Sequence, residues 1–221
     1  MTVLFDIILC GALAFLGYIF TYNYLNGRKM FSIDRKLFVW SAPRLYYLLA
    51  VVAIFSTTIT VFHVLYDLSV IEQFRLLTLI SLMIPAAAVD YKVQKIPNAV
   101  IISAFVLRIV LLAAEFAESV SNGVSLLKDD LIGMTVIGGF FLLIMLIFKN
   151  SIGMGDVKMF AVMGIYQGLW GAFNSVFFSL LVSFVLSIAL LVAKKKKKHD
   201  TIPFGPSILI GTVIAVNLAG M

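Results

Sequence analysis

Long apolar runs alternate with short polar segments along the whole chain. Most of these runs reach the roughly 20 residues that a helix needs to cross about 30 Å of hydrocarbon. The polar segments between them are too short to hold a soluble domain. The pattern predicts eight membrane-spanning helices: Val3–Leu25, Leu45–Tyr66, Leu76–Val89, Ala99–Glu115, Leu131–Phe148, Val157–Gln167, Ala172–Ala193 and Ile202–Ala219.

Composition also indicates an integral membrane protein. Of the 221 residues, 62% are hydrophobic and 13% are charged, whereas a soluble domain has about 25% charged residues. We therefore expect an all-α polytopic helix bundle, with residues 1–221 forming a single membrane domain. The first apolar run has no basic stretch before it and no small-residue cleavage site after it, so we interpret it as a retained span. A lone Cys10 excludes an intramolecular disulfide and a cysteine-based zinc site.

The basic residues are distributed unevenly among the connections between predicted spans. Fourteen of the seventeen fall in the first, third, fifth and seventh connections, including the run Lys194–Lys198. Basic connections face the cytoplasm, so this asymmetry predicts that both termini lie outside. The net charge of +6 therefore reports orientation and attraction to anionic lipid at the cytoplasmic face, and we expect no nucleic-acid partner.

Two acidic residues lie at the predicted cytoplasmic boundary. Asp90 ends the third apolar run and Asp156 opens the sixth, and the topology places both on one side of the membrane. An ionisable residue at or within a span costs roughly 2.5 to 3.5 kcal/mol, so each should have a reason to be there. Two carboxyl groups that share a proton can hydrolyse a peptide bond, one drawing a proton from water and the other donating to the scissile carbonyl.

Other interpretations of this pair stay open at this point. Asp90 and Asp156 could be solvated carboxylates at the headgroup level, or ion ligands in a small transporter or proton-coupled channel, since acids that line broken helices serve that purpose. A structural scaffold in a secretion or pilus machine is a third possibility. Arg108 lies deep in the fourth span with Glu115 two turns away on the same face. We expect a structural role for it, as a buried ion pair or by snorkelling to the outer edge.

The glycines before Asp156 favour a close backbone approach. Gly153 and Gly155 flank Met154, and glycine allows backbone conformations that a tight turn or an extended substrate strand next to it requires. The segment lacks the GxxxxGK[ST] spacing of a phosphate-binding loop and follows a membrane span instead of a strand. Nucleotide binding is therefore disfavoured.

Three motifs together carry a family resemblance. They are Asp90 with Ile96-Pro97-Asn98 after it, Gly153-Met154-Gly155-Asp156-Val157-Lys158, and Ile202-Pro203-Phe204-Gly205-Pro206. With these motifs in this order, the chain resembles the type IV prepilin peptidases and archaeal preflagellin peptidases, which are GxGD aspartyl proteases of the membrane. The resemblance covers the chain from about Leu76 to its end.

The resemblance implies a function and a site. It implies a multi-pass enzyme of the inner (plasma) membrane with Asp90 and Asp156 as the catalytic pair and no metal or cofactor. Its substrate would be a pilin-like precursor, a type IV prepilin or pseudopilin, cut at the cytoplasmic face between a short basic leader and a hydrophobic helix. The other motif residues would bind substrate or shape the site.

The flanking residues also have interpretations of their own. Pro97 and Asn98 suit a helix start. The backbone N–H that proline lacks has no partner there, and the asparagine side chain can cap the helix. Pro203 to Pro206 form a stiff turn that either lines the site or sets the angle of the last span. Lys158 is expected to anchor to lipid phosphate, because two residues along a helix it points away from Asp156. Pro85 could kink or break the third span and open a polar path to Asp90.

One departure from the resembled family concerns a second activity. Many bacterial members carry an insert with two CxxC pairs between the first two spans, which accompanies N-methylation of the new amino terminus. Here that connection runs only from Asn26 to Arg44 and contains no cysteine. We therefore expect a peptidase without N-methyltransferase activity.

Overall fold

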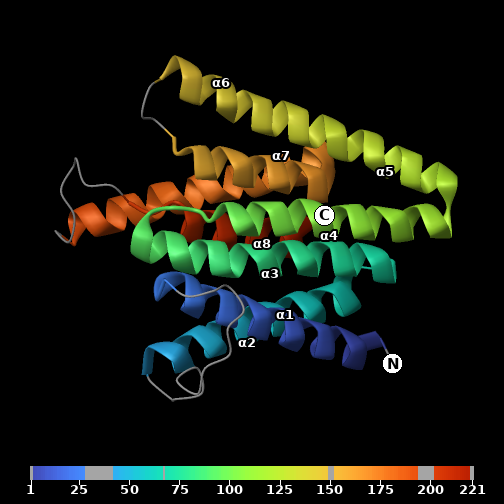
Figure 1. The fold of residues 1–221 in the computed structure, drawn as a ribbon, viewed down its shortest axis with the longest axis horizontal. Helices are drawn as coiled ribbons and strands as arrows, with labels where there is room; N and C mark the ends of the chain where they lie inside the picture. The colour runs from blue at the N-terminus through green and yellow to red at the C-terminus, as the bar shows by residue number, and fades with distance from the viewer. Residues whose placement is uncertain (1, 28–41, 67, 149–151, 194–201, 220–221) are drawn as a thin grey trace.

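The computed structural model describes residues 2–27, 42–66, 68–148, 152–193 and 202–219, and these form helices joined by short connections (Figure 1). The predicted all-α class is confirmed. The elements are α1 (Thr2–Leu25), α2 (Ala42–Leu65), α3 (Val70–Val93), α4 (Asn98–Glu118), α5 (Val120–Gly133), the π-helix η2 (Met134–Gly138), α6 (Gly139–Ile147), α7 (Met154–Val192) and α8 (Gly205–Ala219).

Every predicted apolar run falls largely within a helix. Within the described residues, five ranges are long and apolar enough to cross a membrane: Tyr47–Leu65, Val70–Val93, Asn98–Glu118, Val120–Ile147 and Met154–Val192. The count of eight spans and the outward orientation of the termini stay predictions. The lysine run 194–198 and most of the connection from Asn26 to Arg44 lie outside the described residues.

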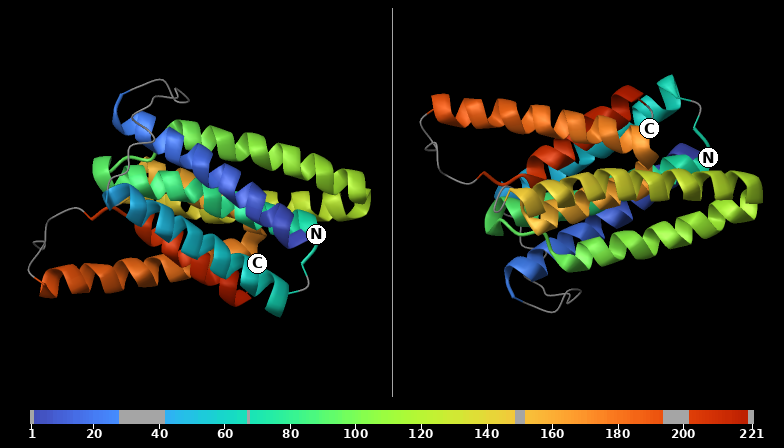
Figure 2. Two further views of the ribbon diagram at one scale, coloured as in Figure 1. Left: turned by 90° about the horizontal axis from the view of Figure 1, so that it is seen from below. Right: turned by 90° about the horizontal axis from the view of Figure 1, so that it is seen from above.

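The helices run roughly along one direction, so their ends gather at two ends of the bundle (Figure 1). The end of α3 and the starts of α4, α7 and α8 lie together at one of them, on the left in Figure 1. Turning the molecule shows that α7 packs against α8 and diverges from the bundle toward its C-terminal end (Figure 2). The three motifs singled out in the sequence therefore meet at one end.

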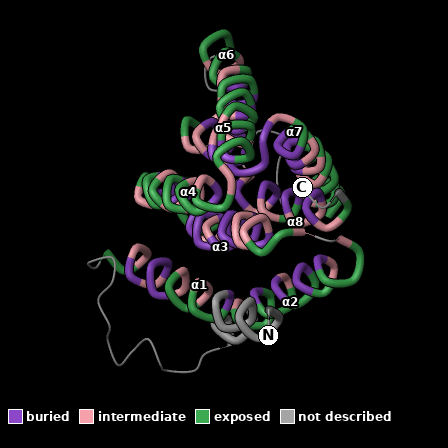
Figure 3. The backbone as a smooth tube through the Cα atoms, turned by 90° about the vertical axis from the view of Figure 1, so that its right-hand side faces the viewer, coloured by how far each residue is buried: buried purple, intermediate pink, exposed green. Residues whose placement is uncertain are grey.

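Helix α3 is the central element of the bundle. About 72% of its most apolar window is buried, against 28% or less in the other four candidate spans. Its buried residues are mostly aliphatic, such as Leu76, Ile80 and Ala86, and the tube coloured by burial shows α3 largely purple with green faces on the outer helices (Figure 3). Apolar outer faces suit lipid contact. A polar residue in the buried middle of α3, between Leu76 and Asp90, is consequently enclosed by protein.

Two details of α3 differ from the prediction. The helix extends past Val89 to Val93, so Asp90 lies within its last turn. Pro85 lies inside the helix without ending it, and the predicted break is wrong. At this level α1 approaches closely, because a Cβ atom added to Gly17 would lie 3.5 Å from Pro85 Cδ. Close packing by a neighbouring helix lets α3 continue through the proline.

The polar segment 120–130 was expected to be a connection, and it is helical instead. Ser119 caps α5 by accepting a hydrogen bond from the Asn122 N–H, and the helix continues through η2 into α6. Asp130, which the sequence places in an outer connection, is only 2% exposed and pairs with Arg108. Hydropathy counts Asp130 as an exposed charge, because it takes no account of Arg108, a residue of another helix that neutralises it.

Helix α7 combines two predicted spans around one break. Gly168 has φ 65° and ψ −168°, which interrupts the helix between residues 154–167 and 169–192. Such a φ favours glycine. A Cβ atom on Gly133 of α5 would lie 2.5 Å from the Gly168 carbonyl carbon. The break at Gly168 therefore packs directly on the backbone of α5 at Gly133, where there is no room for a side chain.

Candidate active site

Asp90 lies in the last turn of α3 and is 5% exposed. Its Oδ2 atom accepts a hydrogen bond of 2.7 Å from the Gly205 N–H, and the Phe204 N–H also donates to this carboxylate. The N–H groups at the start of a helix have no partner within the helix, and this end carries a partial positive charge. Asp90 therefore caps α8 from a different helix, which fixes the direction of its carboxylate.

Gly205 is the residue that permits this contact. A Cβ atom at this position would lie 2.8 Å from Asp90 Cβ and 2.9 Å from Oδ2. Because Asp90 Cβ is attached directly to the backbone of α3, the clash cannot be relieved by rotating the carboxyl group alone. The motif glycine thus lines the site and also starts α8 at residue 205, three residues later than the apolar run predicts.

Asp156 is the third residue of α7. Gly153 occupies the N-cap position, and its N–H donates to the Asp156 side chain. An acidic residue at this position that accepts from the N-cap N–H is one half of a capping box. A Cβ atom on Gly153 would lie 3.2 Å from Asp156 Oδ2, so this glycine leaves room for the carboxylate. The side chain is half-buried.

The two carboxyl groups lie within electrostatic reach of each other. Asp90 faces the N-terminus of α8 and Asp156 the N-terminus of α7, so two positive helix ends converge on the pair. Like charges at short range disfavour double ionisation, whereas helix N-termini favour negative charge. An arrangement of this kind suits two carboxyl groups that carry one proton between them.

The Ile96-Pro97-Asn98 segment connects α3 to α4 and packs on the first turn of α7. A Cβ atom on Gly155 would lie 3.0 Å from Ile96 Cβ, so α7 approaches this segment closely. The turn begins at Gln94, whose φ of 54° is in the left-handed region and whose N–H donates to the Asp90 carbonyl. A glutamine does not indicate this conformation, which glycine or asparagine adopts more readily.

Asn98 and Lys158 are hydrogen-bond partners, a contact that was not predicted. Pro97, not Asn98, is the N-cap residue of α4, and it makes no side-chain cap bond. The Lys158 Nζ donates to Asn98 Oδ1 at 2.9 Å. The predicted helix start at Pro97-Asn98 is confirmed, but the expected side-chain cap by Asn98 is wrong. The anchoring of Lys158 to lipid stays a prediction. The hydrogen bond between the two side chains joins the start of α7 to the start of α4.

Phe204 fixes the last motif against α7. Its ring meets Phe160 edge-on at a centroid distance of 5.8 Å, and Phe160 stacks on Phe141 of α6 at 4.1 Å. Such ring pairs stabilise by about 0.5 to 1.5 kcal/mol beyond their buried area. Pro203 and Pro206 on either side are half-buried. Of the two roles left open for this turn, the contacts with Asp90 favour lining the site.

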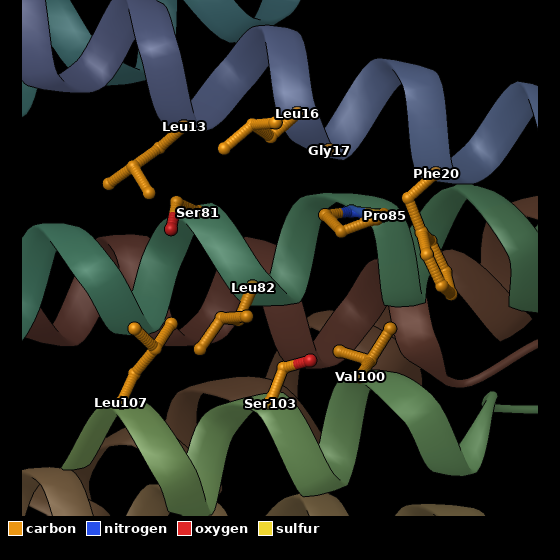
Figure 4. Close-up of a pocket in the computed structure, with 10 residues that line it drawn as sticks. All are labelled: Leu13, Leu16, Gly17, Phe20, Ser81, Leu82, Pro85, Val100, Ser103 and Leu107. Carbon is orange, nitrogen blue, oxygen red and sulfur yellow. The ribbon is translucent and has the colours of Figure 1, made fainter. Parts of the chain in front are cut away.

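Among the described residues, two apolar hollows border α3. One, of about 150 Å³, lies between α1, α3 and α4 and is lined by Leu13, Gly17, Pro85, Val100 and other residues, with no charged side chain (Figure 4). The other, of about 350 Å³, lies between α2, α3 and α8. Tyr91 and Lys92 border it beside Asp90, and Pro206 borders it beside Gly205. The second hollow thus adjoins the carboxylate pair.

Comparison with known proteins gives two matches. The model of the type IV leader peptidase family matches residues 77–192, a range that includes Asp90 and Asp156. A prepilin leader peptidase/N-methyltransferase of Bacillus subtilis (strain 168) is 30% identical over 145 residues, which is 66% of this chain and 56% of that relative. The chain thus matches little more than half of the relative's length. No solved structure matches.

Proposed function

Because the chain belongs to the type IV leader peptidase family, we propose that it is a membrane aspartyl endopeptidase that removes the short basic leader from pilin-like precursors. The family match and the Bacillus subtilis relative support leader cleavage in general. The aspartic type is supported by one observation, the placement of Asp90 at the N-terminus of α8 and of Asp156 at the N-terminus of α7, at the same end of the bundle (Figure 1).

The proposed mechanism uses the two carboxyl groups as a unit. One, ionised, takes a proton from a water molecule, and the other, protonated, donates a hydrogen bond to the scissile carbonyl. We assign neither role to an individual residue, since interacting sites titrate as a pair. Backbone N–H groups of Phe204 and Gly205 hold Asp90, and that of Gly153 holds Asp156. Held in this way, the carboxylates need little rearrangement when the substrate arrives.

The hydrophobic helix of the precursor is proposed to approach from the bilayer. The hollow between α2, α3 and α8 supports this route, because it is lined mostly by apolar residues and ends beside Asp90. Cleavage would then fall at the cytoplasmic face, where the positive-inside rule places this end of the bundle. The leader would remain on the aqueous side of the carboxylate pair.

The proposal is tested by co-expressing the chain with a type IV prepilin in a host that lacks its own leader peptidase. We expect a shorter product whose amino terminus, determined by mass spectrometry, is the first residue after the basic leader. A precursor that stays full-length beside folded enzyme in the same membranes would overturn the proposal. Ion flux through liposomes containing the enzyme, in the absence of cleavage, would favour a transporter instead.

We further propose that the activity is cleavage without methyl transfer, as the cysteine-free connection from Asn26 to Arg44 suggests. Purified enzyme is expected to release the mature product from a prepilin without incorporating a labelled methyl group from S-adenosylmethionine. The Bacillus subtilis relative, whose name records both activities, is the positive control. Labelled product formed by the present chain would contradict this part of the proposal.

A further inference from the structure

A buried charge cluster lies away from the carboxylate pair, where α3, α4, α5 and α7 meet. Arg108 is 1% exposed, and it donates from Nε to Asp130 Oδ2 at 2.9 Å and from Nη2 to Glu115 Oε2 at 2.9 Å. Arg75 lies 3.7 Å from Glu115 on the opposite side. Two cations thus face two anions, and the predicted ion pair of Arg108 with Glu115 is confirmed.

Arg108 makes one further contact that charge neutralisation does not require. Its Nε also donates to the backbone carbonyl of Ile165 at 2.9 Å. Ile165 lies in the last turn before the break at Gly168, and in an unbroken helix its carbonyl would accept from the residue four positions later. The break interrupts that pattern. The guanidinium therefore supplies a donor to the end of a helix segment in a part of the protein that excludes water.

The electrostatics of this segment agree with a capping role. Residues 154–167 form a short helix whose N-terminal end is positive and whose C-terminal end is negative. Asp156 lies at the positive end and Arg108 at the negative end. Ile165 lies nine positions after Asp156, which corresponds to about 14 Å along the axis. Each end of this segment thus meets the charge that its dipole favours.

We propose that Arg108 is a positioning residue of the peptidase, which caps the broken end of α7 and thereby fixes the segment that carries Asp156. This inference rests on the proposed function. A cluster that only stabilised the bundle could join α3, α4 and α5 through Glu115 and Asp130 without a bond to α7. The bond to Ile165 adds an axial constraint on residues 154–167, and Tyr166 adds a second one by donating to the Ala104 carbonyl at 2.9 Å.

The test separates positioning from stability by removing the charges in pairs. Arg108→Met with Asp130→Leu removes one cation and one anion and leaves the pair of Arg75 with Glu115 in place. Replacing a buried ion pair by apolar residues of similar volume is often neutral for stability. We expect this double variant to unfold at a temperature close to wild type. Its kcat should fall by roughly 10- to 100-fold at unchanged KM, the loss that a small misplacement of a catalytic group causes.

Two single variants complete the series. Asp130→Asn keeps the bond from Arg108 Nε to the Ile165 carbonyl, so its kcat should stay within about threefold of wild type. Lost positioning is expected to lower kcat by roughly tenfold or more. In Arg108→Lys, the single ammonium cannot reproduce the fork that reaches Glu115, Asp130 and Ile165 together. Its kcat should fall at unchanged KM even if the double variant does not accumulate. Wild-type kcat in a folded Arg108→Met/Asp130→Leu or Arg108→Lys variant would overturn the proposal.

A second measurement does not depend on activity. Amide hydrogen exchange across residues 154–167 reports how firmly this segment is held at its two ends, by the packing of Gly155 on Ile96 and by the bond from Arg108 to Ile165. We expect exchange in this segment to be several-fold faster in Arg108→Met/Asp130→Leu than in wild type, with exchange in α1 and α2 unchanged. Equal exchange in both proteins would overturn the positioning role. Absence of cleavage by the wild-type chain would instead overturn the proposed function, and the exchange rates would still report on Arg108.

Discussion

Asp90→Asn and Asp156→Asn are each expected to reduce prepilin cleavage by roughly 10²- to 10⁴-fold, the contribution of a positioned acid or base. An amide can neither take a proton from water nor supply the shared proton of the pair. Because the two groups act as a unit, the double variant should be no worse than the more severe single variant. Initial cleavage rates at matched enzyme levels in membranes provide the measurement.

Glu118→Gln is the matched control for these variants. Glu118 ends α4 at the opposite end of the bundle and is exposed, so loss of its charge should leave the cleavage rate unchanged. The unfolding temperature should be similar for Asp90→Asn, Asp156→Asn, Glu118→Gln and wild type. An Asn at either aspartate position can still accept a hydrogen bond from the backbone N–H groups that hold the acid. Cleavage near the wild-type rate in both aspartate variants would exclude the pair as the catalytic groups.

Gly205→Ala is expected to cost about 100-fold in kcat, because the added methyl group would displace Asp90 by a fraction of an ångström to about 1 Å. The new Cβ atom would lie 2.8 Å from Asp90 Cβ, so α8 and α3 must separate and the 2.7 Å hydrogen bond from the Gly205 N–H must lengthen. The loss should appear in kcat more than in KM. Steady-state cleavage of a purified precursor provides both parameters.

Gly139→Ala provides the comparison for this substitution. Gly139 begins α6, and among the described residues no atom outside its own stretch of helix lies within 4 Å of the position that its Cβ would take. Alanine there should leave activity unchanged and stabilise the helix by up to about 1 kcal/mol, since alanine is the better helix former. If Gly205→Ala retained full activity while folded, the site would have to tolerate a displaced Asp90, and the proposed role of Gly205 would be wrong.

The helical class could be predicted, and the residues of the candidate site could be chosen, because each depends on local sequence. Apolar runs of sufficient length specify helices, and the alternation of basic connections places Asp90 and Asp156 on one side without any structure. Contacts between distant residues could not be predicted in this way. Lys158 and Asn98 are 60 positions apart, and the pattern of each helix alone suggested lipid and a cap instead.

The charge cluster was missed in part for a related reason. Glu115 lies on the same helix as Arg108, so helical periodicity reveals the pair. Asp130 belongs to another helix and follows a polar segment, which hydropathy assigns to a connection. The π-helix after it and the left-handed Gln94 follow from packing against neighbouring elements, and neither has a sequence signal of its own.

The break at Gly168 also sets a limit on changes in chain length. Between Asp156 and Ile165 the segment is an uninterrupted helix whose two ends are attached to different helices, through Gly155 against Ile96 at one end and Arg108 at the other. Inserting or deleting one residue would turn one end relative to the other by about 100° and shift it by about 1.5 Å. The segment is therefore a spacer of fixed length, and we expect a one-residue insertion or deletion between Asp156 and Ile165 to abolish cleavage.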